Sequence, residues 1–149
     1  MEQKKLLACL MLHRELIHHL KKATRTPEFC LAAVRQDGWI IQELTHAERT
    51  PEVCKAAVQQ VTCAITYLTK AERTQDLCLS MVQAYGWSIE HLTEDERTPS
   101  VIDAAIKASS HALIYLTESQ RTPEVVRQAI SYHPSSKEYL NDTQLAYLD

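Results

Sequence analysis

The ten residues from Arg49 to Val58, RTPEVCKAAV, carry the strongest structural signal in the chain. Similar segments begin at four other arginines, so that one segment starts every 24 residues: Arg25, Arg73, Arg97 and Arg121. One leucine recurs at the same interval: Leu20, Leu44, Leu68, Leu92, Leu116 and Leu140. A constant period of this size is the signature of a repeat protein. We therefore divide the chain into six repeats, residues 1–24, 25–48, 49–72, 73–96, 97–120 and 121–144, with a tail at 145–149.

Each repeat is predicted to begin with a short α-helix. With the arginine as position 1, the threonine at position 2 can cap the helix, the proline fits its first turn, and the glutamate favours the positive end of the helix dipole, as in Thr50-Pro51-Glu52. Apolar residues then follow at the spacing of a buried helix face, as at Val53, Cys54, Ala57 and Val58. The residues at position 14 are expected to end this helix: Gly38, Thr62, Gly86, Ser110 and Pro134.

A second short helix is predicted after this break. Apolar residues stand at positions 17 and 20 of the repeat, as at Ile41 and Leu44. The segments Thr45–Glu48 and Thr69–Glu72 have the T-x-x-E pattern of a capping box, which predicts one further helical turn at the end of the repeat.

A two-helix unit of this length cannot bury its apolar face alone, whereas stacked copies share one continuous core. We therefore expect an all-α fold, an α-solenoid of six 24-residue helix-turn-helix repeats that forms a single domain over residues 1–149. The first repeat lacks the RTP segment and carries Lys4 and Lys5, and the last has Lys137 where the others have Ile or Leu. We interpret these atypical end repeats as polar caps.

The composition disfavours several other classes of protein. The 149 residues include two glycines, where roughly ten would be usual, and both β-rich folds and phosphate-binding loops need glycine. The net charge of −3 gives no reason to expect a nucleic acid or an anionic membrane as partner. No apolar stretch is long enough to span a membrane. The odd number of cysteines, three of them in one column, indicates reduced thiols and a cytoplasmic location.

The repeats resemble a family of bacterial helical repeats defined only as a domain of unknown function. Units of that family read approximately E-V-V-L-A-A-V-K-Q-N-G, then A-L-x-Y/L-A/T-S-x-E. The segment Glu28–Gly38, EFCLAAVRQDG, is the closest match, and Glu52–Gln60 is nearly as good. The RTPE opening differs from the family's usual N-D-x-E. The resemblance implies a bacterial α-solenoid and, because such arrays are similar to parts of effector and toxin-associated proteins, an interaction role; it implies no catalytic or binding residue.

The sequence shows no pattern typical of an enzyme. The densest histidine cluster, His13, His18 and His19, lacks the i, i+4 spacing of a helical zinc motif. The cysteine column, Cys30, Cys54 and Cys78, falls on the apolar stripe of the first helix, which favours inert core thiols over nucleophiles. We therefore expect a non-enzymatic protein with no catalytic residue, metal or cofactor.

The column of arginines at position 1 has two interpretations. It could be a basic ladder that grips the phosphates of a nucleic acid. It could instead form salt bridges between repeats and hydrogen bonds to the ends of neighbouring helices. Because acidic residues immediately precede three of these arginines (Glu48, Glu72 and Glu96), we favour the second interpretation.

A candidate binding stripe follows the second helices, where the residues at positions 15 and 19 vary between repeats and are rich in Trp, Tyr and His. Trp and Tyr are enriched at interface hot spots. An alternative for the two tryptophans is that they fill gaps between repeats. With the neighbouring acids, the predicted partner-binding residues are Trp39, Glu43, Tyr67, Trp87, Glu90, His91, Glu94, Asp95, His111, Tyr115 and Tyr139.

These observations lead to a functional hypothesis. A small acidic binder without an active site is expected to be monomeric when free and to occlude a protein partner. The first expectation is an inhibitor or immunity protein that neutralises a bacterial toxin, for example a basic nuclease domain. The alternatives are an effector or adaptor module that binds a host or signalling protein, and a nucleic-acid-binding repeat that uses the arginine column.

Overall fold

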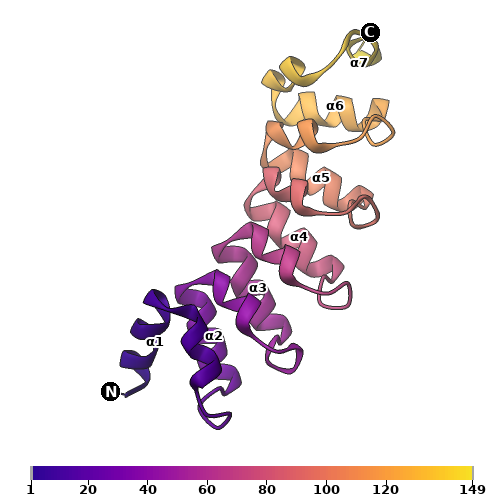
Figure 1. Ribbon diagram of the computed structural model, residues 1–149. Coiled ribbons are helices and arrows are strands. Elements are labelled where there is room, and N and C mark those ends of the chain that lie inside the picture. The colour runs from indigo at the N-terminus through magenta and orange to yellow at the C-terminus, as the bar shows by residue number, and fades with distance from the viewer. Residues whose placement is uncertain (1, 149) are drawn as a thin grey trace. The chain divides into compact units, whose positions relative to one another are not determined.

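The computed structural model describes residues 2–148 and is helical throughout (Figure 1). No β-strand occurs within residues 2–148, so the prediction of an all-α fold is confirmed. The chain forms two compact units, one that ends at Thr74 and one that begins at Gln75. None of the helices within the described range is long and apolar enough to cross a membrane.

The first unit alternates α-helices with short 3₁₀-helices. Its elements are α1 (Glu2–Leu12), η1 (Arg14–His19), α2 (Pro27–Gln36), η2 (Gly38–Glu43), η3 (His46–Glu48), α3 (Pro51–Gln60) and η4 (Thr62–Tyr67), where η marks a 3₁₀-helix. The α-helices α1, α2 and α3 contact one another in chain order, and the 3₁₀-helices η1, η2 and η4 do the same. The unit therefore has one layer of α-helices and one of 3₁₀-helices, joined where α3 packs against η2.

The second unit has the same organisation. Its elements are α4 (Gln75–Ala84), η5 (Gly86–His91), η6 (Glu94–Glu96), α5 (Pro99–Ala108), η7 (Ser110–Tyr115), α6 (Pro123–Tyr132), η8 (Pro134–Tyr139), α7 (Asp142–Leu145) and η9 (Ala146–Leu148). Helices α4, α5 and α6 contact in chain order, as do η5, η7 and η8. Helix α5 also packs against η5, and α6 against η7.

The predicted helix starts are confirmed. The side chains of Thr26, Thr50 and Thr122 each accept a hydrogen bond from a main-chain N–H in the first turn of the following helix, and a proline occupies that turn. The α-helices end at position 12, and one residue at position 13 separates them from the predicted break at position 14. Asp37 and Val61, at position 13, have extended backbones, with φ of −143° and −141°.

The second helix of each repeat is a six-residue 3₁₀-helix. A 3₁₀-helix has about three residues per turn, so residues three apart lie one above the other. This spacing explains why Ile41 and Leu44, at positions 17 and 20, are both buried. It also places position 18 directly above position 15 on the exposed side of the helix.

The two glycines are explained by close packing. Neither has a positive φ, so neither is needed for an unusual backbone conformation. A Cβ at Gly38 would lie 2.7 Å from the carbonyl oxygen of Ala57 in α3, and one at Gly86 would lie 2.8 Å from the Cβ of Ser109 and closer still to the carbonyl oxygen of Ala105. Each glycine therefore allows the helix of the next repeat to approach the start of a 3₁₀-helix.

Candidate functional site

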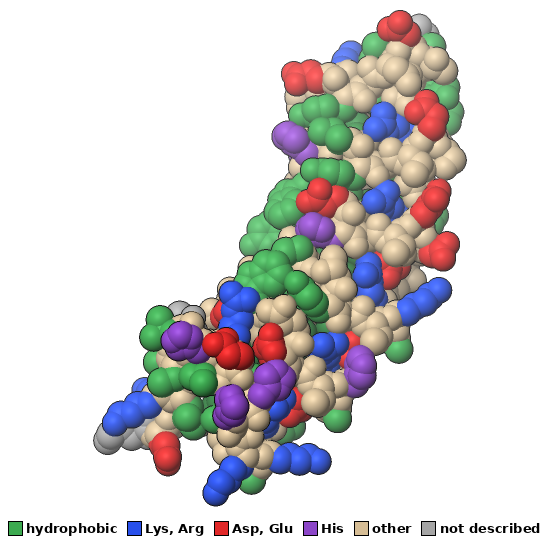
Figure 2. Space-filling model, viewed as in Figure 1, with side chains coloured by type: hydrophobic (Ala, Val, Ile, Leu, Met, Phe, Trp, Pro, Cys, Tyr) green, Lys and Arg blue, Asp and Glu red, His purple; other side chains and the backbone are tan. Residues whose placement is uncertain are grey.

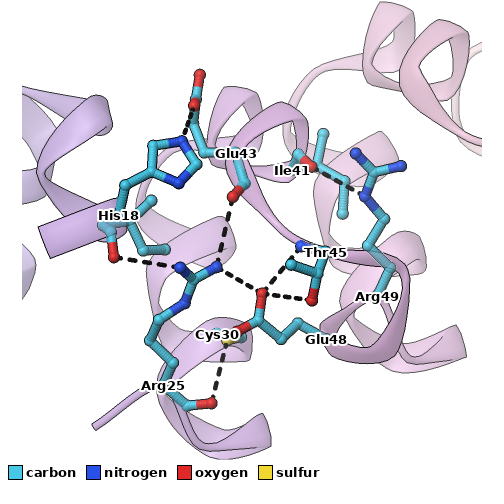
Figure 3. Close-up of polar contacts among 9 residues, drawn as sticks. His18, Arg25, Cys30, Ile41, Glu43, Thr45, Glu48 and Arg49 are labelled. Carbon is cyan, nitrogen blue, oxygen red and sulfur yellow. Dashed lines mark hydrogen bonds and ion pairs between the residues drawn. The ribbon is translucent and has the colours of Figure 1, made fainter. Parts of the chain in front are cut away.

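The arginine at position 1 joins two consecutive 3₁₀-helices (Figure 3). The guanidinium of Arg25 donates hydrogen bonds to the carbonyl oxygens of Ile17 in η1 and Glu43 in η2, both at 3.4 Å, and pairs with Glu48 at 2.5 Å. The last carbonyls of a helix lack partners within the helix, and a cation there is favourable for the helix dipole. Arg25 therefore stabilises the ends of both 3₁₀-helices.

The same arrangement recurs at later arginines. Arg49 donates from Nε to the carbonyl oxygen of Ile41 at 3.1 Å and from Nη1 to that of Tyr67 at 2.9 Å. Arg97 donates from Nη1 to the carbonyl oxygen of Tyr115 at 2.5 Å. The side chains of Arg25 and Arg49 are only 10% and 9% exposed. These contacts favour the structural interpretation of the arginine column over the phosphate-binding one.

The glutamate at position 24 completes this network. Glu72 accepts hydrogen bonds from the main-chain N–H and hydroxyl of Thr69, at 2.7 and 3.0 Å, as the capping-box pattern predicts. Glu48 does the same with Thr45, at 2.9 Å for both bonds. Partial burial raises the pKa of each glutamate, but other contacts outweigh it, and both pKa values lie below the ordinary one. For Glu48 these are hydrogen bonds from Thr45 and Arg25, and for Glu72 they are hydrogen bonds from Thr69 and His46 and the charge of Arg49.

The cysteine column lies in the core. Cys30, Cys54 and Cys78 are buried, and the thiols of Cys30 and Cys54 lie 3.9 and 3.5 Å from the carbonyl oxygens of Arg25 and Arg49. Burial raises the pKa of the Cys54 thiol to about 11 and also raises that of Cys30. A thiol that stays protonated at neutral pH is a poor nucleophile and a poor metal ligand.

Several histidines are paired with carboxylates. His18 lies 2.7 Å from Glu43, and His13 lies 3.5 Å from Glu15. Between residues 2 and 148, no three His, Cys, Asp or Glu side chains are placed together to hold a metal ion.

In the first unit, the predicted stripe is partly covered. The rings of Trp39 and Tyr67 meet edge to face with their centroids 6.0 Å apart. The guanidinium carbon of Arg14 lies 6.0 Å from the centroid of the Trp39 ring, and Nε of Arg14 pairs with Asp37 at 2.8 Å. Trp39 therefore packs between neighbouring repeats, while Tyr67 remains 42% exposed.

In the second unit, the aromatic side chains are more exposed. The ring centroid of Trp87 lies 6.1 Å from that of Tyr85 and 6.2 Å from that of His91. Trp87 is 40% exposed and Tyr85 45% exposed. The carboxylate of Glu90 lies 3.6 Å from the ring of His91.

Residues of η7 extend this group, because η5 and η7 lie side by side. The Tyr115 hydroxyl interacts with Glu90, whose negative charge raises the pKa of Tyr115. Ile114, next to Tyr115, is 48% exposed. We call this group the Trp87 surface: Tyr85, Trp87, Glu90, His91, Ile114 and Tyr115. In Figure 2 the face toward the viewer carries hydrophobic, acidic and histidine side chains next to one another.

Tyr85 and Ile114 were not among the predicted site residues. Ile114 could have been found from the repeat frame, because position 18 is polar in every repeat except the one with Ile114. A large apolar residue at a position that is elsewhere polar indicates a surface with a function beyond folding. Position 13 gives no such signal for Tyr85, since it also holds Val61.

The remaining predicted site residues of the second unit are not part of the Trp87 surface. The Tyr139 hydroxyl lies 3.2 Å from Nε2 of His111, and the two rings are 5.3 Å apart. Glu94 and Asp95 are exposed on η6. The predicted stripe is therefore divided into several small groups, in which position 19 of one repeat contacts position 15 or 18 of the repeat before it.

An open groove of about 520 Å³ lies between α4 and α5 and is lined by Leu79, Gln83, Ser100, Asp103, Ala104 and Lys107. Its two charged groups contact Tyr132 of α6. The Tyr132 hydroxyl donates to Asp103 at 3.1 Å, and Nζ of Lys107 lies 5.8 Å from the Tyr132 ring centroid. These contacts indicate that the charges in the groove help α5 and α6 to pack.

Comparison of the chain with protein-family models, curated proteins and solved structures finds no match, so the functional argument depends on the residues themselves.

Proposed function

We propose that the chain is a non-enzymatic protein-binding module, an α-solenoid of six helical repeats, that binds its partner through the Trp87 surface. The observation that supports this most directly is the exposure of Tyr85, Trp87 and Ile114, between 40% and 48%, on or directly before the adjoining helices η5 and η7. Clustered exposed apolar side chains with a polar rim are typical of protein interaction sites, and Trp and Tyr are the residues most enriched at their hot spots.

The charge distribution favours a basic partner. Residues 75–149 contain 11 acidic and 5 basic residues, a formal charge of −6, whereas residues 1–24 carry +3. Complementary charge speeds association and disfavours wrong partners. Together with the resemblance to repeats of toxin-associated proteins, this favours an inhibitor or immunity protein that occludes a basic toxin domain in the bacterial cytoplasm.

The arginine contacts weigh against the nucleic-acid alternative. Arg25, Arg49 and Arg97 use their guanidinium groups on main-chain carbonyls. A phosphate would have to replace these bonds before it could bind, whereas the Trp87 surface is already exposed.

The test uses affinity capture from the organism that makes the protein, followed by reconstitution with the purified partner. The variant carries Tyr85→Ala, Trp87→Ala and Ile114→Ala, and a control carries Gln83→Ala and Lys107→Ala in the groove between α4 and α5. We expect the triple variant to lose the partner and the control to keep it, with both retaining the circular dichroism of a helical protein.

An inhibitor should also suppress the activity of the purified partner at a fixed stoichiometry. A host or signalling protein as partner would instead assign the chain as an effector or adaptor. If the control loses the partner while the triple variant keeps it, the Trp87 surface is not the binding site.

A further inference from the structure

We propose that the Trp87 surface holds an arginine side chain of a basic protein partner, with the guanidinium against the Trp87 ring and paired with the carboxylate of Glu90. The inference rests on the proposed function and specifies the chemistry that the surface recognises.

The first unit already contains such an arrangement. The guanidinium of Arg14 lies over the Trp39 ring at 6.0 Å, and its Nε pairs with Asp37 at 2.8 Å. An indole face attracts a cation through its quadrupole, and a nearby carboxylate supplies the acceptor that a guanidinium needs. Trp39 and Trp87 occupy the same position of their repeats, each directly after a glycine.

In the second unit, the ring neighbours of Trp87 are Tyr85 and His91. Position 13 holds Tyr85 in place of Asp37, and the Tyr85 ring lies 6.1 Å from that of Trp87. Trp87 thus has an additional aromatic neighbour and is 40% exposed.

Glu90 is placed to replace Asp37 as the acceptor. It follows Trp87 by three residues in the 3₁₀-helix η5, so the two side chains leave the helix on the same side. Glu90 already interacts with the Tyr115 hydroxyl and lies 3.6 Å from His91. A carboxylate has about four acceptor sites, so these contacts hold Glu90 in position and leave acceptor capacity for a guanidinium.

The chemistry of the site favours arginine over lysine. A guanidinium is planar, stacks on aromatic rings and can donate to a carboxylate from its edge at the same time. An ammonium is a compact, strongly hydrated charge, which the open Trp87 surface would only partly desolvate. The excess of acidic residues after residue 74 adds a general attraction for a basic segment.

The experiment uses the two tryptophans as internal probes. A capped hexapeptide of alternating glycine and arginine is titrated into the full-length protein, and the two indole N–H signals are followed by ¹H–¹⁵N NMR. We expect the Trp87 signal to shift with saturation and the Trp39 signal to stay in place. The same peptide with citrulline, which keeps the shape and lacks the charge, should leave the Trp87 signal unchanged.

Three variants test the residues. Trp87→Leu and Glu90→Gln should each weaken binding of the arginine peptide by roughly two- to fivefold. Glu138→Gln removes the same charge at the same position of the last repeat, where Ser135 replaces the tryptophan, and should leave the affinity unchanged. Equal shifts of both indole signals, equal binding of the citrulline peptide, or equal effects of Glu90→Gln and Glu138→Gln would overturn the inference.

The peptide titration and the partner-binding test can fail independently of each other. If the purified partner still depends on Trp87 but the arginine peptide fails to shift the indole signal, the surface binds a protein by other chemistry. If the partner binds the triple variant normally, the proposed function fails regardless of the peptide result.

Discussion

At the residue scale, Gly86 lies where a side chain would meet the main chain of α5. Its φ is not positive, so alanine could adopt the same backbone conformation. Without a steric contact, Gly86→Ala would stabilise the protein by about 0.4–1 kcal/mol, because it restricts the unfolded chain. The added Cβ would lie 2.8 Å from the Cβ of Ser109, however, so we expect a loss of about 1–3 kcal/mol.

The test is whether Gly86→Ala lowers or raises the stability of the protein. The change is measured as the shift of the urea unfolding midpoint relative to the wild-type protein. Ser110→Ala, at the same position of the next repeat, is the matched control and should change the midpoint little. A higher midpoint for Gly86→Ala would mean that the two elements are not closely packed at this point.

At the scale of a single element, the turn Thr69–Glu72 couples stability to pH. Partial burial raises the pKa of Glu72, but hydrogen bonds from Thr69 and His46 and the charge of Arg49 bring it below the ordinary value. A carboxylate whose pKa is lower in the folded than in the unfolded protein stabilises the fold at pH values above the unfolded-state pKa. That contribution disappears as the pH falls through the folded-state pKa. Wild-type stability should therefore decrease on acidification.

Glu72→Gln should remove much of this dependence. Glutamine can still accept the main-chain hydrogen bond, as Gln120 does from Thr117 at 3.1 Å. The variant should thus be less stable than the wild type by about 1 kcal/mol at neutral pH, the difference between a charged and a neutral hydrogen bond. The gap, measured by urea unfolding across pH, should close in acid. Glu138→Gln, which removes a charge from an exposed position outside the first turn of an α-helix, is the control, and a constant gap for Glu72→Gln would contradict the expected pH dependence.

The short helical elements show which features could be predicted from the sequence and which could not. The helix starts and capping boxes depend on contacts within four residues, so the T-P-E and T-x-x-E patterns predicted them correctly. The 3₁₀ character of the second helix was missed, since the 17/20 spacing fits both an α-helical and a 3₁₀ turn. The contact of Trp87 with His91 agrees with placing positions 15 and 19 together, whereas Ile114 at position 18 was not predicted.

At the scale of the whole molecule, the 24-residue period predicted which residues repeat but not how side chains of successive repeats meet. Trp39 and Trp87 are equivalent in sequence, yet Trp39 is covered by Arg14 and Tyr67, while Trp87 forms part of an exposed surface. The difference comes from residues about 25 positions away in the chain, outside the reach of local patterns. The contacts of Arg25 and Arg49 with carboxylates and main-chain carbonyls support the structural interpretation of the arginine column, which the neighbouring Glu48 and Glu72 favoured.

The contacts of each unit also predict how stability is distributed along the chain. Within a unit, each α-helix contacts the α-helices next to it in sequence, so a local defect should affect adjacent elements and fade with distance. Ile41 and Ile89 occupy position 17 of their repeats and are both fully buried. Replacing either with valine should lower the free energy of unfolding by about 0.5–1.5 kcal/mol.

In native-state hydrogen exchange, Ile41→Val should reduce protection of amides in α2 and α3 and spare those in α6. Ile89→Val should reduce protection in α4 and α5 and spare those in α2. A uniform loss across residues 2–148 from either substitution would mean that the chain unfolds as one cooperative body, and the repeat-by-repeat account of its stability would be wrong.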